Sequence, residues 1–220
     1  MSRSLDEESS LVPIGRPREF DKSEAIDSAM LLFWRNGYEG TSISDLTETL
    51  GITRPSLYAA FGNKEQLFRT VLDRYDEGTA EFLTGSLDLP TAREVAEGLL
   101  RGAANFHSNP ANPPGCLMVH GALVGSDESD PLRRETRDRR ARLREAIRKR
   151  LERALAEGDL PEHADPEALA RYIVAVMRGM AVEAASGAKG RELHQIVDMA
   201  IRAWPAHLTH SGERDRPLGG

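Results

Sequence analysis

The chain has 220 residues, of which 40% are hydrophobic and 29% are charged, and its formal net charge is −6. This composition is typical of a globular protein long enough to bury a core, and a single cysteine excludes an internal disulfide. No apolar run approaches the ~18 residues of a membrane-spanning helix, and the first residues lack the apolar segment of a signal peptide. We therefore expect a cytoplasmic protein with no membrane partner. The acidic balance argues against a generic polyanion binder.

The first part of the chain predicts an unstructured arm and three short helices. Residues 1–19 mix Ser, Pro, Gly and charge without periodicity, so we expect them to be disordered. Apolar residues then recur at helical spacing, interrupted by glycines, which predicts helices at about 21–36, 42–50 and 53–61. Thr41 or Ser42 can cap the second helix. Thr53 can cap the third, which carries Pro55 in its first turn.

Longer helices are predicted in the rest of the chain. Asn63 can cap a fourth helix that runs to about residue 85. Helical spacing then predicts segments at about 92–107, 116–124, 131–157, 166–185 and 191–204, before a tail at 205–220 that we expect to be unstructured. The expected fold is therefore all-α. It has an N-terminal three-helix domain with a helix-turn-helix at 20–66, followed by a helical bundle at 67–204.

Gly51 marks a tight turn between two of the short helices, as in a helix-turn-helix, whose second helix lies in the major groove of DNA. Arg54, Ser56 and Ala59 would then point outward. Glycine turns between helices are common, so this pattern alone is weak. The apolar residues that would hold the two helices together are Leu46, Leu50, Ile52, Leu57 and Phe61.

Three blocks of sequence resemble the TetR family of transcriptional regulators: 33–42 (FWRNGYEGTS), 50–58 (LGITRPSLY) and 61–68 (FGNKEQLF). They occur in the order and spacing of that family, and the helical layout downstream is similar as well. The resemblance implies a homodimeric repressor that binds a pseudo-palindromic operator in double-stranded DNA and is released by a small-molecule or electrophile inducer. It implies neither a cofactor nor a resident metal.

Two other classes of protein remain as alternatives. The first is a transcriptional activator or a DNA-binding protein that responds to no ligand. The second is a small helical ligand-binding protein or enzyme that does not bind DNA. No Ser-His-Asp order, phosphate-binding glycine loop or cluster of metal ligands supports an enzyme, so we expect none.

The resemblance assigns the DNA contacts residue by residue. Hydroxyl and backbone donors at a helix N-terminus suit a phosphate oxygen, and contacts of this kind set register and supply affinity. Arg54 is the candidate for a bidentate contact with guanine, and Pro55 for an apolar contact with a thymine methyl group. The expected phosphate contacts are Thr41, Ser42, Tyr58 and Lys64, and the residues expected to face base edges are Thr53, Arg54, Pro55, Ser56 and Ala59.

Three features of this region stay open. Many relatives carry a second aromatic residue or a histidine after the tyrosine, whereas this chain has Ala59 and Ala60, so that contact is not expected here. Tyr38 fits core packing and phosphate contact equally well. Arg16 and Arg18 fit a disordered arm better than a basic arm in the minor groove.

A regulator of this kind responds to a ligand, and the resemblance places the ligand site in the helical bundle. An apolar pocket with a few polar groups is the usual form of a small-molecule site. Most of the candidate residues could equally be plain core. The candidates are Phe82, Leu99, Phe106, His107, Cys116, Met118, Val119, His120 and Leu151.

Cys116 and His120 lie one helical turn apart, which allows three interpretations. The favoured one is that Cys116 is a small buried apolar side chain. A Gly-Cys step at this place is similar to that of some electrophile sensors in the family, so a redox or electrophile-sensing thiol is the second. Metal sensing is the third, although two ligands do not make a site.

Two further surfaces are predicted. Acidic residues are interspersed among the arginines from Arg133 to Arg153, which indicates a solvated helix face with ion pairs rather than a second nucleic-acid surface. The apolar helices at about 166–185 and 191–204 are expected to form a four-helix dimer interface, as the resemblance implies. Its expected residues are Leu169, Tyr172, Ile173, Val176, Met177, Met180, Leu193, Ile196, Val197, Ala200, Ile201 and Trp204.

Overall fold

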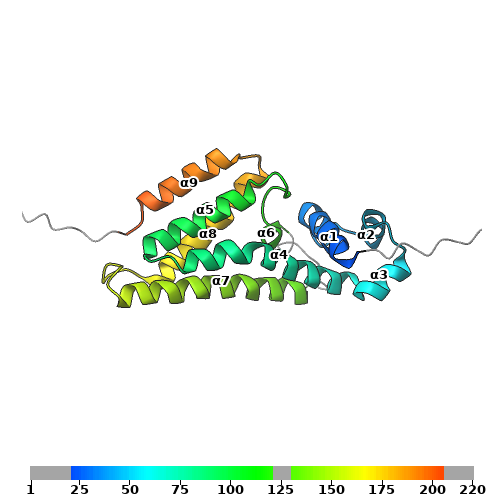
Figure 1. Ribbon diagram of the computed structural model, residues 1–220, viewed down its shortest axis with the longest axis horizontal. Coiled ribbons are helices and arrows are strands. Elements are labelled where there is room, and N and C mark those ends of the chain that lie inside the picture. The colour runs from blue at the N-terminus through cyan, green and yellow to red at the C-terminus, as the bar shows by residue number, and fades with distance from the viewer. Residues whose placement is uncertain (1–20, 121–129, 206–220) are drawn as a thin grey trace, which may run out of the picture.

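The computed structural model describes residues 21–120 and 130–205, and every regular element in these ranges is a helix (Figure 1). The expected arm at 1–19 and the tail beyond Pro205 lie outside the described residues. The expectation of an all-α fold is confirmed. The helices are α1 (Lys22–Asn36), α2 (Ile43–Leu50), α3 (Arg54–Phe61), α4 (Lys64–Leu87), α5 (Ala92–His107), α6 (Leu117–His120), α7 (Asp130–Ala156), α8 (Pro166–Ala185) and α9 (Gly190–Arg202).

Each of the three short N-terminal helices begins after a residue whose side chain caps it. The Asp21 carboxylate accepts hydrogen bonds from the backbone N–H groups of the first turn of α1. Ser42 caps α2, and Thr53 caps α3. The turn between them needs Gly51, whose φ of 63° is left-handed and costs an L-residue with a side chain conformational energy. These local signals explain why the three short helices begin and end where the sequence predicts.

The N-terminal helices pack around an aromatic core. Phe33 of α1 and Phe68 of α4 are fully buried, and their ring centroids lie 5.0 Å apart in an edge-on arrangement. Leu46 and Leu57, from the two helices of the helix-turn-helix, are fully buried in the same cluster. The cluster extends along the first half of α4 to Tyr75, past the expected domain limit at residue 66. The domain limits therefore stay a prediction.

A second apolar cluster fills the C-terminal part. Helix α5 packs against α4, α8 and α9, and α7 packs along α8. Leu99 and Leu100 of α5 are fully buried there, together with Ile147 of α7 and Ile173 of α8. Helix α4 contributes residues to both clusters, and Figure 1 shows it running from α3 into the helical bundle, so one element connects the two parts.

Candidate nucleic-acid interface and ligand pocket

Helix α3 presents one face outward. Thr53, Arg54, Pro55 and Ala59 are exposed, and Ser56 is half-buried. Tyr58 is 47% exposed, which is unusual for a large aromatic side chain on an eight-residue helix. Opposite this face, Leu57 and Phe61 anchor the helix in the N-terminal core, as expected for them. A polar face on a helix held this firmly can enter a groove without further folding.

Arg54 is already positioned by the neighbouring helix. Its Nη2 atom donates a hydrogen bond of 2.8 Å to the hydroxyl of Ser44 on α2. The Thr53 and Ser56 hydroxyls are 2.9 Å apart, and the Thr53 hydroxyl accepts a hydrogen bond from the backbone N–H of Ser56. The outward face therefore carries polar groups whose geometry is set before any ligand arrives.

The expectation for Thr41 is wrong. Its side chain is fully buried, and its hydroxyl donates a hydrogen bond of 2.8 Å to the Gly37 carbonyl. This bond satisfies the Gly37 carbonyl in the turn after α1, so the Thr41 hydroxyl is not available to a phosphate. Ser42, the next residue, is exposed and supplies the cap of α2. Its backbone N–H donates to Asp45, which lowers the pKa of that carboxyl.

Tyr38 combines a packed ring with a neighbouring cation. The ring lies 6.2 Å from that of Phe33 and 5.1 Å from that of Phe68, so the core-packing interpretation holds for the ring. Lys64 is the first residue of α4, and its ammonium group lies 4.2 Å from the centroid of the Tyr38 ring, a cation–π distance. Burial lowers the pKa of Lys64, and the nearby Glu39 and Asp45 oppose this shift. A phosphate contact by Lys64 stays a prediction.

A cavity of about 130 Å³ lies between α4, α5, α6, α7 and α8. Six of the expected pocket residues line it: Phe82, Phe106, His107, Cys116, Met118 and Val119. Leu99 and Leu151 do not, because both are fully buried in the C-terminal apolar cluster, where α5 meets its neighbours. The side chain of His120 lies outside the described part of the chain, so its pairing with Cys116 is untested.

The Cys116 thiol sits on the cavity wall beside a tyrosine. The Tyr75 hydroxyl donates a hydrogen bond of 3.1 Å to its sulfur. Burial raises the pKa of the thiol, and the Tyr75 hydroxyl and the Arg140 guanidinium partly oppose this. Within the described residues, no group of three or more His, Cys, Asp or Glu side chains could hold a metal ion. Because its pKa is raised, the thiol is mainly protonated at neutral pH, although the residue as a whole is half-buried.

Charged residues of the cavity were missed by the sequence analysis. Asp76, Arg139, Arg140 and Arg178 all line it. The arginines of α7 were expected to face solvent, but only some do so. Arg150 is 7% exposed and donates hydrogen bonds to the backbone carbonyls of Leu87, Leu89 and Pro90. One sequence signal could have indicated a charged cavity wall: Arg178 is a single charge in the middle of the apolar segment 173–182.

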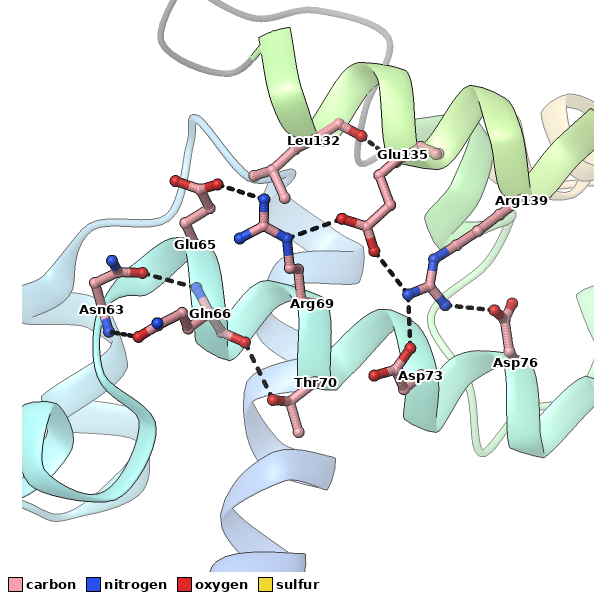
Figure 2. Close-up of polar contacts among 11 residues, drawn as sticks. Asn63, Glu65, Gln66, Arg69, Thr70, Asp73, Asp76, Leu132, Glu135 and Arg139 are labelled. Carbon is pink, nitrogen blue, oxygen red and sulfur yellow. Dashed lines mark hydrogen bonds and ion pairs between the residues drawn. The ribbon is translucent and has the colours of Figure 1, made fainter.

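An ionic cluster joins α4 to α7 beside the cavity (Figure 2). Arg139 lies 2.6 Å from Asp73, 2.6 Å from Asp76 and 2.8 Å from Glu135. Arg69 lies 2.8 Å from Glu135, which thus bridges two arginines. Burial would lower the pKa of Arg139, but its three carboxylate partners outweigh burial and raise it. These ion pairs connect the first half of α4 to α7, so a tilt of α4 would require them to rearrange.

Most of the expected dimer residues face the interior of their own chain. The apolar stripe of α8 packs on α5 and α7, and that of α9 packs on α5, because one chain alone supplies a complete bundle. Tyr172 is 37% exposed, whereas Leu169, Val176 and Ile196 are half-buried. The expected interface residues that are instead buried within their own chain are Ile173, Met177, Met180, Leu193, Val197, Ala200, Ile201 and Trp204.

A different surface of these helices is exposed and apolar. On α8 it comprises Ala168, Tyr172, Ala175, Gly179 and Val182, spaced three or four residues apart. On α9 the exposed apolar residue is Met199, at 62%. Val182 is 48% exposed. Small residues in the middle of such a surface permit close approach of another helix.

Comparison with known proteins identifies this architecture. A family model described as bacterial regulatory proteins, tetR family, matches residues 25–71, which span α2 and α3. A tetracyclin repressor-like C-terminal domain model matches residues 96–200. The HTH-type transcriptional repressor ComR of Escherichia coli (strain K12) is 35% identical over 193 residues, covering 87% of this chain and 92% of the relative. The chain belongs to the TetR family.

Solved structures of TetR-family members share the fold. A cysteine variant of the regulator CifR, complexed with 26-bp double-stranded operator DNA, is 40% identical with a TM-score of 0.82 and covers 87% of this chain and all of that one. A TetR regulator from Chloroflexus aurantiacus is 25% identical with a TM-score of 0.73. The match covers 82% of this chain and 91% of that one. No described helix of this TetR-family chain is long and apolar enough to cross a membrane.

Proposed function

We propose that this TetR-family protein is a transcriptional repressor that binds a pseudo-palindromic operator as a homodimer and is released by a small molecule in the α4–α8 cavity. The observation that carries this proposal is the outward face of α3, where Arg54 and Tyr58 are exposed on a firmly anchored helix. The operator complex of the related CifR supports DNA as the partner. Such a protein acts in the cytoplasm and needs no enzymatic activity.

The DNA contacts divide into two kinds. Tyr58, Lys64 and Ser42 are assigned to phosphates, which supply affinity without sequence information. Arg54 is assigned to a guanine, a contact worth roughly 1–3 kcal/mol of discrimination. Thr53, Pro55, Ser56 and Ala59 are assigned to neighbouring base edges. Thr41 is not included, because its hydroxyl is used within the fold.

Dimerisation is assigned to the exposed apolar surface of α8 and α9, which contains Tyr172, Val182 and Met199. Two recognition helices read one operator only when they lie about 34 to 36 Å apart, in successive major grooves. Helix α4 begins next to α3 and lines the cavity through Tyr75, Thr79 and Phe82. A ligand that binds more tightly to a conformer with α4 tilted would shift the population away from the DNA-binding spacing.

A gel-shift titration on the DNA upstream of the protein's own gene tests this proposal. Arg54→Ala should relax sequence preference, whereas Tyr58→Phe and Lys64→Ala should weaken specific and scrambled DNA alike. Arg142→Ala, on the exposed side of α7, is the control and should bind as the wild type does. Equal, sequence-blind loss from Arg54→Ala would refute its assignment. A reporter that falls when the protein is deleted would indicate an activator instead.

A further inference from the structure

Two guanidinium groups of the cavity lack the partners that their neighbour has. Arg139 is surrounded by three carboxylates, but Arg140 of α7 and Arg178 of α8 have no carboxylate within ion-pair distance in the described ranges. The Nε atom of Arg140 is fully buried and has no hydrogen-bond partner among the described residues. Both side chains are half-buried and line the same cavity.

Burial and nearby positive charges act on these two cations. Burial lowers the pKa of Arg178, and the positive charge of Arg140 lowers it further. Burial also lowers the pKa of Arg140. Removing like charges from water without a counter-charge is unfavourable, and arginine stays protonated in proteins. In the free protein this arrangement costs stability, and a bound anion would remove that cost.

Much of the remaining cavity wall is apolar, although Asp76 and Arg139, which pair with each other, and His107 also line it. Phe82, Phe106, Val174 and Met177 line it around the two guanidinium groups. Its volume of about 130 Å³ is close to that of an engineered protein cavity that holds one benzene molecule, ~150 Å³. The site therefore suits a single ring or a short branched chain that carries one small anionic group.

We propose that this cavity binds a small organic carboxylate, whose apolar part lies against Phe82 and Phe106 and whose carboxylate pairs with Arg140 and Arg178. A carboxylate is the smallest common organic anion that matches the planar fork of a guanidinium with two parallel hydrogen bonds. The inference rests on the proposed function for its regulatory meaning, since it names the chemical class of the inducer. It does not depend on DNA binding for its physical basis.

Calorimetric titration of the DNA-free protein with three probes of equal shape tests the charge requirement. Benzoate should bind, benzamide should bind at least tenfold more weakly, and benzamidine should not bind detectably. The pair 3-phenylpropanoate and 3-phenylpropanamide extends the test to a longer stem. If neither carboxylate binds better than its amide, the proposal is overturned.

Variants of the two arginines locate the binding site. Arg140→Gln and Arg178→Gln should each weaken benzoate by roughly tenfold to a hundredfold, as expected for the loss of a charged hydrogen-bond donor, and should leave benzamide unchanged. Arg142→Gln, on the exposed side of α7, is the matched control and should change neither probe. Undiminished benzoate affinity in both cavity variants would overturn the proposal.

The melting temperature of the ligand-free variants gives a second readout. Arg178→Gln should melt at the same temperature as the wild type or higher, because it removes an unpaired cation. A fall of several degrees would show that the charge is already compensated, which contradicts the proposal. Operator binding by the wild type is measured separately. Its failure would refute the repressor function and leave the calorimetric result standing.

Discussion

The Nη1 atom of Arg139 lies 2.6 Å from the Oδ2 atom of Asp76, so a side chain of the cavity wall on α7 holds the helix that leads to α3. Both residues line the cavity, and Asp76 belongs to α4 itself. A carboxylate bound at Arg140 would lie next to this ion pair. Binding of the proposed ligand would thus occur beside a charge that holds α4.

Replacing Arg139 tests the strength of this connection. Arg139→Gln should lower the free energy of unfolding by about 1–3 kcal/mol, because it leaves Asp73, Asp76 and Glu135 close together without their shared cation. Urea denaturation measures this change. The exposed Arg142→Gln should stay within about 0.5 kcal/mol of the wild type. Equal stability of the two variants would show that the cluster contributes nothing.

The same cluster predicts a pH dependence. Burial would raise the pKa of Glu135, but hydrogen bonds from Arg139 and Arg69 outweigh it and lower the pKa below its ordinary value of 4.5. The ionised carboxylate therefore contributes stability at neutral pH, and this contribution is lost as the pH falls below about 4.5. Melting temperatures measured from pH 6 to pH 3 should fall more steeply for the wild type than for Glu135→Gln. Parallel curves would rule out Glu135 as a source of the dependence.

The thiol of Cys116 should react slowly with alkylating agents at neutral pH. Burial raises its pKa, so the reactive thiolate is scarce, and the rate with iodoacetamide should climb as the pH passes 9. Tyr75→Phe should slow the reaction at pH 7.5, because it removes a hydrogen bond that lowers the thiol pKa. A fast reaction at pH 7.5 would instead favour the electrophile-sensing hypothesis. That hypothesis fails if Cys116→Ser leaves operator release by quinones or hypochlorite unchanged.

A charge on the outer surface of α8 should impair dimerisation without harming the fold. Val182 is 48% exposed in the single chain, so Val182→Glu should keep the helical circular dichroism of the wild type. In a dimer that buries this surface, an unpaired carboxylate should weaken association at least tenfold. Light scattering after size-exclusion chromatography measures the mass. Arg93→Glu, exposed on α5, is the control, and an intact Val182→Glu dimer would place the interface elsewhere.

Local signals made the helix-turn-helix predictable from sequence. Ser42, Gly51 and Thr53 each set a helix end through contacts with near neighbours, which short-range patterns encode. The outward position of Arg54 followed from the burial of Leu57 and Phe61 on the opposite side. Thr41 was misplaced because its buried hydroxyl bonds back to Gly37, and sequence spacing does not reveal such a turn.

The bundle was less predictable because periodicity identifies an apolar stripe but not its partner. Met177 and Ile201 looked available for a second subunit, yet α5 and its neighbours cover them within one chain. Leu99 was assigned to the cavity because it lies on an apolar stripe, but it packs in the C-terminal apolar cluster instead. Arg140 was assigned to solvent because charge is usually exposed, and only the packing of α7 against α8 brings it to the cavity wall.

The hydrogen bonds of Arg150 hold the C-terminal end of α4. This side chain grips the carbonyls of Leu87, Leu89 and Pro90 at the far end of the helix, so that end should stay in place while the other swings. Thr79 on the cavity wall lies about 8 residues from Leu87, and Lys64 about 23 residues, on a rod that rises 1.5 Å per residue. If α4 tilted as a rigid rod about that end, with its ion pairs to α7 rearranged, a displacement of about 1 Å at Thr79 would become about 3 Å at Lys64. Under the proposed function, such a tilt would let a ligand the size of one ring change the spacing of the two recognition helices on DNA.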